Sequence, residues 1–256
     1  LTVNELPTNS LTINETPICI GETTGITIQN SQIGISYQLR LDSTNANIST
    51  PINGTGGDIS FNVSPTSTTL YNILATNNTS NCSIVLVEKS NIVVNAYPEN
   101  NLPFQDQTLC FGNSLNLVLN NTQIDIDYQL RLDSDNSLVG LPISGNDSDI
   151  QFLVSPSATT TYNVLATNNT TSCSITNIET ATVTVFPLPL VTPIVALTQC
   201  DDDNDGITQF NLTEANDLIS ADAANEIFTY YLTQADADGG LVADQIPNFT
   251  AYLNPI

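Results

Sequence analysis

The sequence contains no histidine, tryptophan or methionine, and only 3 of its 256 residues are basic. Without histidine there can be no Ser-His-Asp triad, no histidine-ligated metal site and no imidazole general base. The cations Arg40, Lys89 and Arg131 are outnumbered by 26 acidic residues, which gives a net charge of −23. Nucleic acids and anionic membrane surfaces both require basic patches, so neither partner is expected. Direct membrane insertion is not expected either, because the best apolar stretch, 186–197, is interrupted by three prolines.

The remaining composition suits a folded β-protein. Hydrophobic residues make up 40% of the chain and charged residues 11%, which favours a packed core over disorder. The polar residues are mostly Asn, Thr and Ser, and these favour strands and turns over long helices. The chain starts at Leu1 without a charged-then-apolar leader, so we expect a fragment or processed product of a longer protein.

A repeat of 91 residues organises most of the chain. The segment ISYQLRLDS at 35–43 returns as IDYQLRLDS at 126–134, and residues 61–84 return with few changes at 152–175. After the last cysteine of each copy we expect the register to slip by two residues, which aligns 95–98 with 184–187. The sequence therefore predicts two copies of one domain.

Within each copy, apolar residues alternate with polar ones, which indicates half-buried strands separated by turn-rich segments. About seven short strands in 90 residues favour an immunoglobulin-like antiparallel sandwich. The expected fold class is all-β, with tandem immunoglobulin-like β-sandwich domains in a rod and a partial third, mostly-β module. The expected domains are 1–98, with a preceding strand or linker at 1–16, then 99–189 and a truncated third module at 190–256. Four tyrosines are expected to point into the cores: Tyr37, Tyr71, Tyr128 and Tyr162.

Four of the five cysteines follow the repeat, with Cys19 and Cys82 in the first copy and Cys110 and Cys173 in the second. Pairing within each copy, Cys19 with Cys82 and Cys110 with Cys173, is the simplest connectivity that respects the repeat. Each such bond would contribute roughly 4 kcal/mol in the chain-entropy model. Matched cysteines in small β-domains are typical of an oxidising compartment. The alternative is reduced thiols in a cytosolic protein.

Two segments, 97–107 and 186–195, contain proline but no glycine. Because proline favours stiff, extended backbone, we expect both to act as stiff linkers. Stiffly linked domains of equal size form a rod in which each module contacts its neighbours, and a rod holds something away from a surface.

The third segment begins at Val191, where the repeat stops, and contains the acidic stretch DDDNDG at 201–206. Alternating carboxylates followed by glycine resemble the start of a calcium-binding loop. The full EF-hand pattern is absent, because Leu212 occupies the position where glutamate is required. A shorter calcium loop and a solvated acidic turn both remain open. The candidate calcium ligands are Asp201, Asp203, Asp205 and the carbonyl of Ile207.

The rest of this segment predicts a short helix with Thr213 as its N-cap, a strand over 226–233 and a turn over 234–240. Cys200 is expected to pair with a cysteine beyond Ile256, with a free thiol as the alternative.

No enzyme is expected. The acidic residues fall in turns and on outward strand faces, and no histidine can activate the abundant Ser and Thr hydroxyls. Lys89 alone is poor support for a Ser-Lys device. A sugar-binding platform would need exposed aromatic rings, and Tyr230 with Tyr231 is the only adjacent aromatic pair that must place one ring away from the core.

Several motifs resemble a known family. The C-x-G at Cys19 and Cys110 and the SP-x-x-T-T-x-Y at 64–71 and 155–162 resemble immunoglobulin-like repeats of very large secreted Bacteroidota proteins. The segment 199–216 resembles a module of the same proteins, often found near a type IX secretion sorting domain. Some members are giant adhesins for gliding motility, similar to SprB. The resemblance implies export by the type IX pathway and an adhesive or stalk role, with no catalytic residues.

Our leading hypothesis is a structural repeat segment of a large exported adhesin, located at the cell surface or secreted. Its expected partners are neighbouring repeats, surface polysaccharide, or the outer-membrane motility and secretion machinery. One alternative is a carbohydrate-binding or accessory module of a secreted protein, and another is a subunit of an extracellular filament. Ser43, within the Asp-Ser-Thr at 42–44, is a candidate O-glycosylation site.

Overall fold

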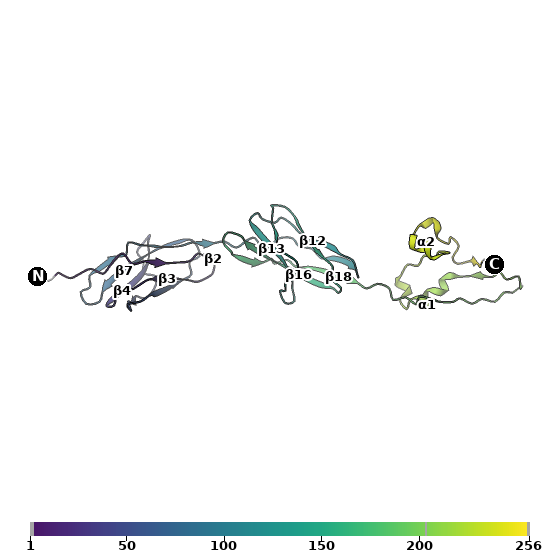
Figure 1. Ribbon diagram of the computed structural model, residues 1–256, viewed down its shortest axis with the longest axis horizontal. Coiled ribbons are helices and arrows are strands. Elements are labelled where there is room, and N and C mark those ends of the chain that lie inside the picture. The colour runs from purple at the N-terminus through teal and green to yellow at the C-terminus, as the bar shows by residue number, and fades with distance from the viewer. Residues whose placement is uncertain (1–2, 203, 255–256) are drawn as a thin grey trace. The chain divides into compact units, whose positions relative to one another are not determined.

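The computed structural model describes residues 3–202 and 204–254, and the chain divides into two compact units, 1–185 and 186–256. The first unit contains both copies of the repeat, and each copy folds as an immunoglobulin-like β-sandwich (Figure 1). The second unit has little regular structure.

The first repeat packs two antiparallel sheets against each other. One sheet has the strand order β1-β3-β6, and the other has the order β5-β4-β7-β8 with β9 also paired to β7. In addition, β10 pairs with β2 in parallel. The strands are β1 Ile13–Asn14, β2 Ile18–Cys19, β3 Thr24–Ile28, β4 Ile35–Leu41, β5 Ile52–Asn53, β6 Ile59–Val63, β7 Thr69–Asn77, β8 Ser83–Val85, β9 Ser90–Ile92 and β10 Val94–Asn95.

The second repeat has the same plan. Its larger sheet has the order β11-β18-β16-β13-β14, with β17 also paired to β16, and it packs on the pair β12-β15. A bridge between Phe104 and Leu119 replaces the β1-β3 pairing of the first repeat. The strands are β11 Gln107–Cys110, β12 Leu115–Leu119, β13 Ile126–Leu132, β14 Ile143–Ser144, β15 Ile150–Val154, β16 Thr160–Asn168, β17 Ser174–Thr176 and β18 Ala181–Phe186.

The offset of 91 residues extends beyond the last cysteine of each copy. Ser90 pairs with Tyr71, and Ala181 pairs with Tyr162 in the same way. The expected two-residue slip is therefore wrong. Pairing with the long strands β7 and β16 fixes the register of the last strands, whatever their side chains. Equivalent side-chain bonds, from the N–H groups of Val94 and Val185 to threonine hydroxyls, continue that register.

Each repeat has its own hydrophobic core, and the four tyrosines that were expected to point into the cores belong to them. Tyr37 and Tyr128 are fully buried, and Tyr71 and Tyr162 are nearly so. The Tyr37 hydroxyl accepts a hydrogen bond from the Gln32 N–H at 2.9 Å, and the Tyr128 hydroxyl accepts one from Gln123 at 2.8 Å. Burial raises the pKa of all four tyrosines. These rings serve the cores and do not form a ligand surface.

A buried asparagine in each repeat ties the strand face to the turn after β4 or β13. Asn72 is 3% exposed, and its amide donates to Asp42 and Asn45 while its oxygen accepts from Arg40 Nε at 2.9 Å. Asn163 makes the corresponding three bonds in the second repeat. Every polar atom of these amides is therefore satisfied, as burial of a polar side chain requires. Lys89 adds an ion pair to Asp42 at 2.8 Å in the first repeat.

The second unit differs from its expected secondary structure. Its elements are β19 Gln209–Phe210, the 3₁₀ helix η1 Leu212–Ala215, α1 Asn216–Ile219, η2 Ala223–Asn225, α2 Gln234–Gly239, η3 Val242–Asp244 and β20 Tyr252–Leu253. The predicted N-cap at Thr213 is wrong, because the Asn211 side chain accepts from the Thr213 N–H and caps η1. The predicted strand over 226–233 is also wrong. Only the isolated bridge between Tyr231 and Gln245 forms in that region, and β19 pairs with β20 instead.

The predicted turn over 234–240 is the helix α2. The Thr233 side chain accepts from the Asp236 N–H and caps its first turn, and Gly240 ends it with φ +65°.

Candidate functional site

The chain enters each repeat at one end of the sandwich, here called the leading end, and leaves at the opposite, trailing end. Cys19 lies at the trailing end of the first repeat, although it comes early in the sequence. It is on β2, which pairs with the final strand β10, so that Cys19 lies beside Asn95. The N–H of Ile20 donates to the Asn95 carbonyl at 2.9 Å. Cys19 is thus close to where the chain leaves for the second repeat.

Cys173 lies at the leading end of the second repeat, although it comes late in the sequence. It ends the turn 168–173 that follows β16, and the first residue of this turn, Asn168, pairs with Ile126 at the start of β13. The incoming chain is at the same end, since the Leu102 N–H donates to Asn177 Oδ1 at 2.9 Å and the Ile178 N–H donates to the Asn100 carbonyl.

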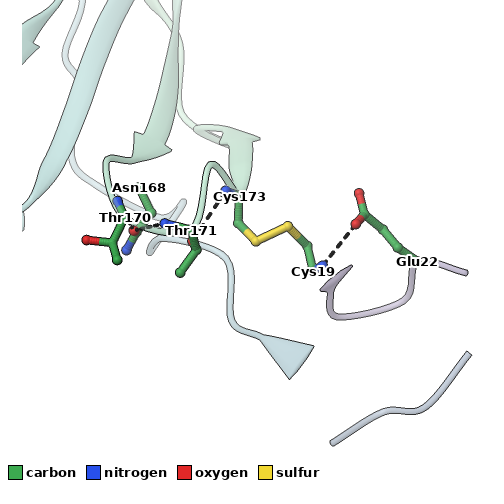
Figure 2. The surroundings of a disulfide bond; sticks show 6 residues. All are labelled: Cys19, Glu22, Asn168, Thr170, Thr171 and Cys173. Atoms are coloured by element: carbon green, nitrogen blue, oxygen red, sulfur yellow. Dashed lines mark hydrogen bonds between the residues drawn. A yellow bond between two sulfur atoms is a disulfide. The ribbon is translucent and has the colours of Figure 1, made fainter. Parts of the chain in front are cut away.

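Cys19 and Cys173 form a disulfide between the two repeats, with a Cα–Cα distance of 5.7 Å and a sequence separation of 154 (Figure 2). The expected pairing within each copy, Cys19 with Cys82 and Cys110 with Cys173, is therefore wrong. Cys82 and Cys110 are free, and Cys110 is exposed.

Strand length explains why pairing within a copy fails. Cys19 lies near the start of β7, because the Val94 N–H beside it bonds the Thr68 hydroxyl. Cys82 follows the end of β7, where its carbonyl accepts from the Asn77 N–H at 2.9 Å. The nine residues of β7 span roughly 30 Å at a rise of about 3.3 Å each. A disulfide needs Cα atoms within about 7 Å, so the two cysteines of one copy cannot meet.

The C-x-G motif has a local structural reason. The N–H of Glu22 donates to the Cys19 carbonyl, and Gly21 between them has φ +89°, which is the pattern of a type II turn. The Glu22 carboxylate then accepts from the Cys19 N–H at 2.9 Å (Figure 2). Cys110, Gly112 and Asn113 form the same turn in the second repeat. This turn fixes the backbone of the cysteine at the trailing end.

The turn that holds Cys173 is equally constrained. Asn168 Oδ1 accepts from the N–H groups of Thr170 and Thr171, both at 2.9 Å (Figure 2). The Asn168 N–H donates to the Cys173 carbonyl, and Ser172 adopts φ +61°. Sequence reasoning overlooked this geometry. Tracing strand direction from one end of the sandwich to the other would have separated the two cysteines of each copy.

The acidic loop at 201–206 is shaped by its own side chains. Asp201 accepts from the N–H groups of Asn204 and Gly206, at 2.9 and 2.8 Å, and Asp205 accepts from the Ile207 N–H at 2.8 Å. Asp203 lies outside the described residues. Within residues 3–202 and 204–254, no three His, Cys, Asp or Glu side chains gather as a metal-binding group. Calcium binding by this loop stays a prediction.

The other candidate residues are not brought to a common site. Tyr230 stacks on Phe249 with centroids 5.1 Å apart, and its hydroxyl donates to Asn216 Oδ1 at 2.6 Å. The Tyr231 hydroxyl accepts from Gln245 Nε2. Both rings are half-buried, and their contacts give them structural roles in the second unit. Ser43 is exposed in the turn after β4, and its glycosylation stays a prediction.

Residues 196–256 match the family FIDD, the Flavobacterium inter-domain disulphide bond domain, and this segment contains Cys200, which is free and exposed. A search of curated proteins found no match. None of the helices in the described part of the chain is long and apolar enough to cross a membrane.

Similar solved structures include a three-domain titin segment, I67–I69, and fibronectin(III)-like modules of CbhA from Clostridium thermocellum. The titin structure is 12% identical with a TM-score of 0.39, and the match covers 71% of this chain and 66% of that one. The match thus spans just under two thirds of the titin structure. The CbhA modules are 10% identical with a TM-score of 0.38, and the match covers 69% of this chain and 94% of that one.

Proposed function

We propose that the chain is a segment of the stalk of a large exported cell-surface adhesin of Bacteroidota. In this role the disulfide between the repeats keeps the residues that it encloses from being drawn out when the stalk is under tension. The single observation that carries the proposal is the Cys19–Cys173 bond, which joins the trailing end of one repeat to the leading end of the next. The Flavobacterium family match of residues 196–256 supports the source, and a disulfide supports an oxidising compartment outside the cytosol.

The bond changes the covalent path that tension follows. When the chain is pulled from its two termini, force passes from Cys19 directly to Cys173 through sulfur. The residues between them are excluded from that path and cannot lengthen it. They would otherwise release about 550 Å of extended chain, from a sequence separation of 154 and about 3.6 Å per residue. Both sandwiches are protected from being pulled open, because the loop that the bond closes, residues 19–173, contains most of the strands of each one.

The surface suits an exposed stalk. A net charge of −23 keeps such a chain soluble and opposes sideways association of neighbouring molecules. Adhesion itself, through surface polysaccharide or another target, would belong to other parts of the same protein.

Single-molecule pulling tests the mechanical role. The whole chain is tethered by its termini and extended first without reductant and then with dithiothreitol. We expect the roughly 550 Å from the two sandwiches to be released only after reduction, by the estimate above. The Cys19→Ser variant should release it without reductant. Full extension of the oxidised wild-type chain would contradict the proposed role.

Labelling of intact cells tests the location. An antibody raised against this chain should bind whole cells of the producing organism, and protease added outside should remove the signal. A signal that requires lysis of the cells would overturn the placement on the surface.

A further inference from the structure

Two cysteines of the repeats have no partner within their own unit, and they occupy the same positions as the bonded pair. Cys82 corresponds to Cys173, and Cys110 corresponds to Cys19, each at an offset of 91 residues. The bond that forms uses the trailing-end cysteine of one repeat and the leading-end cysteine of the next. Shifting that bond by one repeat assigns Cys82 to a repeat that precedes the first one.

The turn around Cys82 is built like the turn around Cys173. Asn77 Oδ1 accepts from the N–H groups of Thr79 and Ser80 at 2.9 and 3.1 Å, and the Asn77 N–H donates to the Cys82 carbonyl at 2.9 Å. Asn81 has φ +58°, close to the +61° of the equivalent Ser172. The backbone around Cys82, at the leading end of the first repeat, therefore has the same conformation as the backbone around the disulfide-bonded Cys173.

The free cysteines are more exposed than the bonded Cys173. Cys173 is 1% exposed with its partner in place, whereas Cys82 is only partly buried and Cys110 is exposed. The turns that hold Cys82 and Cys173 share their hydrogen bonds, so these turns do not account for the difference between those two cysteines. Cys173 is bonded to the first repeat, and its side chain is covered there.

We propose that Cys82 is the attachment point for a preceding immunoglobulin-like repeat, through a disulfide to a cysteine in that repeat's trailing C-x-G turn. This inference rests on the proposed function, in which the chain is part of a tandem array. Every junction between repeats would then carry one bond of the Cys19–Cys173 type. Tension would then cross every junction through a disulfide, and inside each repeat it would pass from the leading-end cysteine to the trailing-end cysteine.

Bond formation is an oxidation, and its balance requires a disulfide donor. The two thiols lose two protons and two electrons as the S–S bond forms. A donor such as oxidised glutathione takes them up and is reduced to two thiols.

A fusion tests the proposal, because residues 1–185 form a compact unit that can precede a second copy in one polypeptide. Pro7, Pro98 and Pro189 are each 91 residues apart, so joining residues 1–189 to residues 8–256 keeps the spacing of the natural junction. The first copy carries Cys82→Ser and the second carries Cys110→Ser. Cys110 then remains only in the first copy and Cys82 only in the second, so a peptide that contains either one can be assigned to its copy. The protein is refolded with oxidised and reduced glutathione, alkylated and digested without reduction.

We expect Cys110 of the first copy to be bonded to Cys82 of the second, and alkylation of that Cys82 to fall at least tenfold. The reference is a matched fusion in which Cys110 of the first copy is also serine. The Cys19–Cys173 bond in the same digest reports whether the repeats have folded. Equal alkylation of Cys82 in the two fusions, with the Cys19–Cys173 bond present, would overturn the proposal.

If the fusion does not fold, the wild-type chain supplies a second test. Oxidation of the concentrated chain should then give covalent dimers joined from Cys110 of one molecule to Cys82 of another. Dimers that lack this linkage, or no dimers, would overturn the proposal. Neither failure would alter the Cys19–Cys173 bond or the pulling experiment, so the two proposals fail separately.

Discussion

Removing the disulfide between the repeats should destabilise both repeats. A disulfide within one copy would stabilise only that copy, so this effect distinguishes the two connectivities. The perturbation is Cys19→Ser, with Cys173→Ser and the double variant alongside. When one repeat unfolds beside its folded neighbour, the bond closes a loop of roughly 75–80 residues, which is worth about 4.5 kcal/mol in the chain-entropy model. When both unfold together, the sequence separation of 154 raises the stabilisation to about 5 kcal/mol.

The assay is urea unfolding followed by hydrogen exchange on peptides from β4 and β13, which reports each repeat separately. We expect either single variant to lower the free energy of unfolding of both repeats, and the double variant to lower it no further. Cys82→Ser and Cys110→Ser are the matched controls, and in the single chain they should change stability by less than about 0.5 kcal/mol. The reasoning would be refuted if Cys82→Ser destabilised the first repeat as much as Cys19→Ser does and left the second repeat unchanged.

Three further outcomes are expected. Asn72→Ala and Asn163→Ala should each lower the stability of their own repeat by about 1–3 kcal/mol in urea unfolding, because the buried groups around the amide lose their partners; a loss below about 0.5 kcal/mol would mean that the amide is dispensable. Hydrogen bonds from Lys89 and Asn72 lower the pKa of Asp42, so its stabilisation is present above the ordinary carboxyl pKa and is lost as pH falls through the lowered value. Acid unfolding of Asp42→Asn should therefore show a smaller loss of first-repeat stability across that range than the wild type, and parallel profiles would contradict this reasoning. If calcium binds the acidic loop, EDTA should speed proteolysis only after Val191, and identical cleavage with and without calcium would contradict calcium binding by this loop.

The sandwiches could be predicted from the sequence because a period of two in the apolar residues reports directly which face of a strand is buried. That pattern placed Tyr37 and its counterpart Tyr128 in the cores, where both are fully buried. Register after the last cysteine could not be inferred in the same way. Main-chain pairing with β7 and β16 sets it, and in the sequence isolated identities such as Pro98 and Pro189 keep the offset of 91.

The disulfide could not be predicted from spacing alone. Equal separations within the two copies suggested internal bonds, but separation along the chain says nothing about which end of a sandwich a residue reaches. The long strand β7 carries the chain from the trailing to the leading end, and this places Cys19 and Cys82 at opposite ends. Pairing with the next repeat is then the connectivity that the strand directions allow.

The second unit was harder to predict because its elements are short and depend on single caps. The apolar run at 226–233 favoured a strand, yet Tyr230 and Phe249 stack on each other and form a small local cluster instead. Helix α2 forms where Thr233 caps Asp236, within a segment whose glycines had indicated only a turn.

Peptide mapping without reduction tests the central claim most directly. The chain is alkylated under denaturing conditions, digested, and searched for cross-linked peptides by mass spectrometry. One cross-linked species should join the peptide containing Cys19 to the peptide containing Cys173, and Cys82 should carry the alkyl label. Species joining Cys19 to Cys82 and Cys110 to Cys173 would contradict the account.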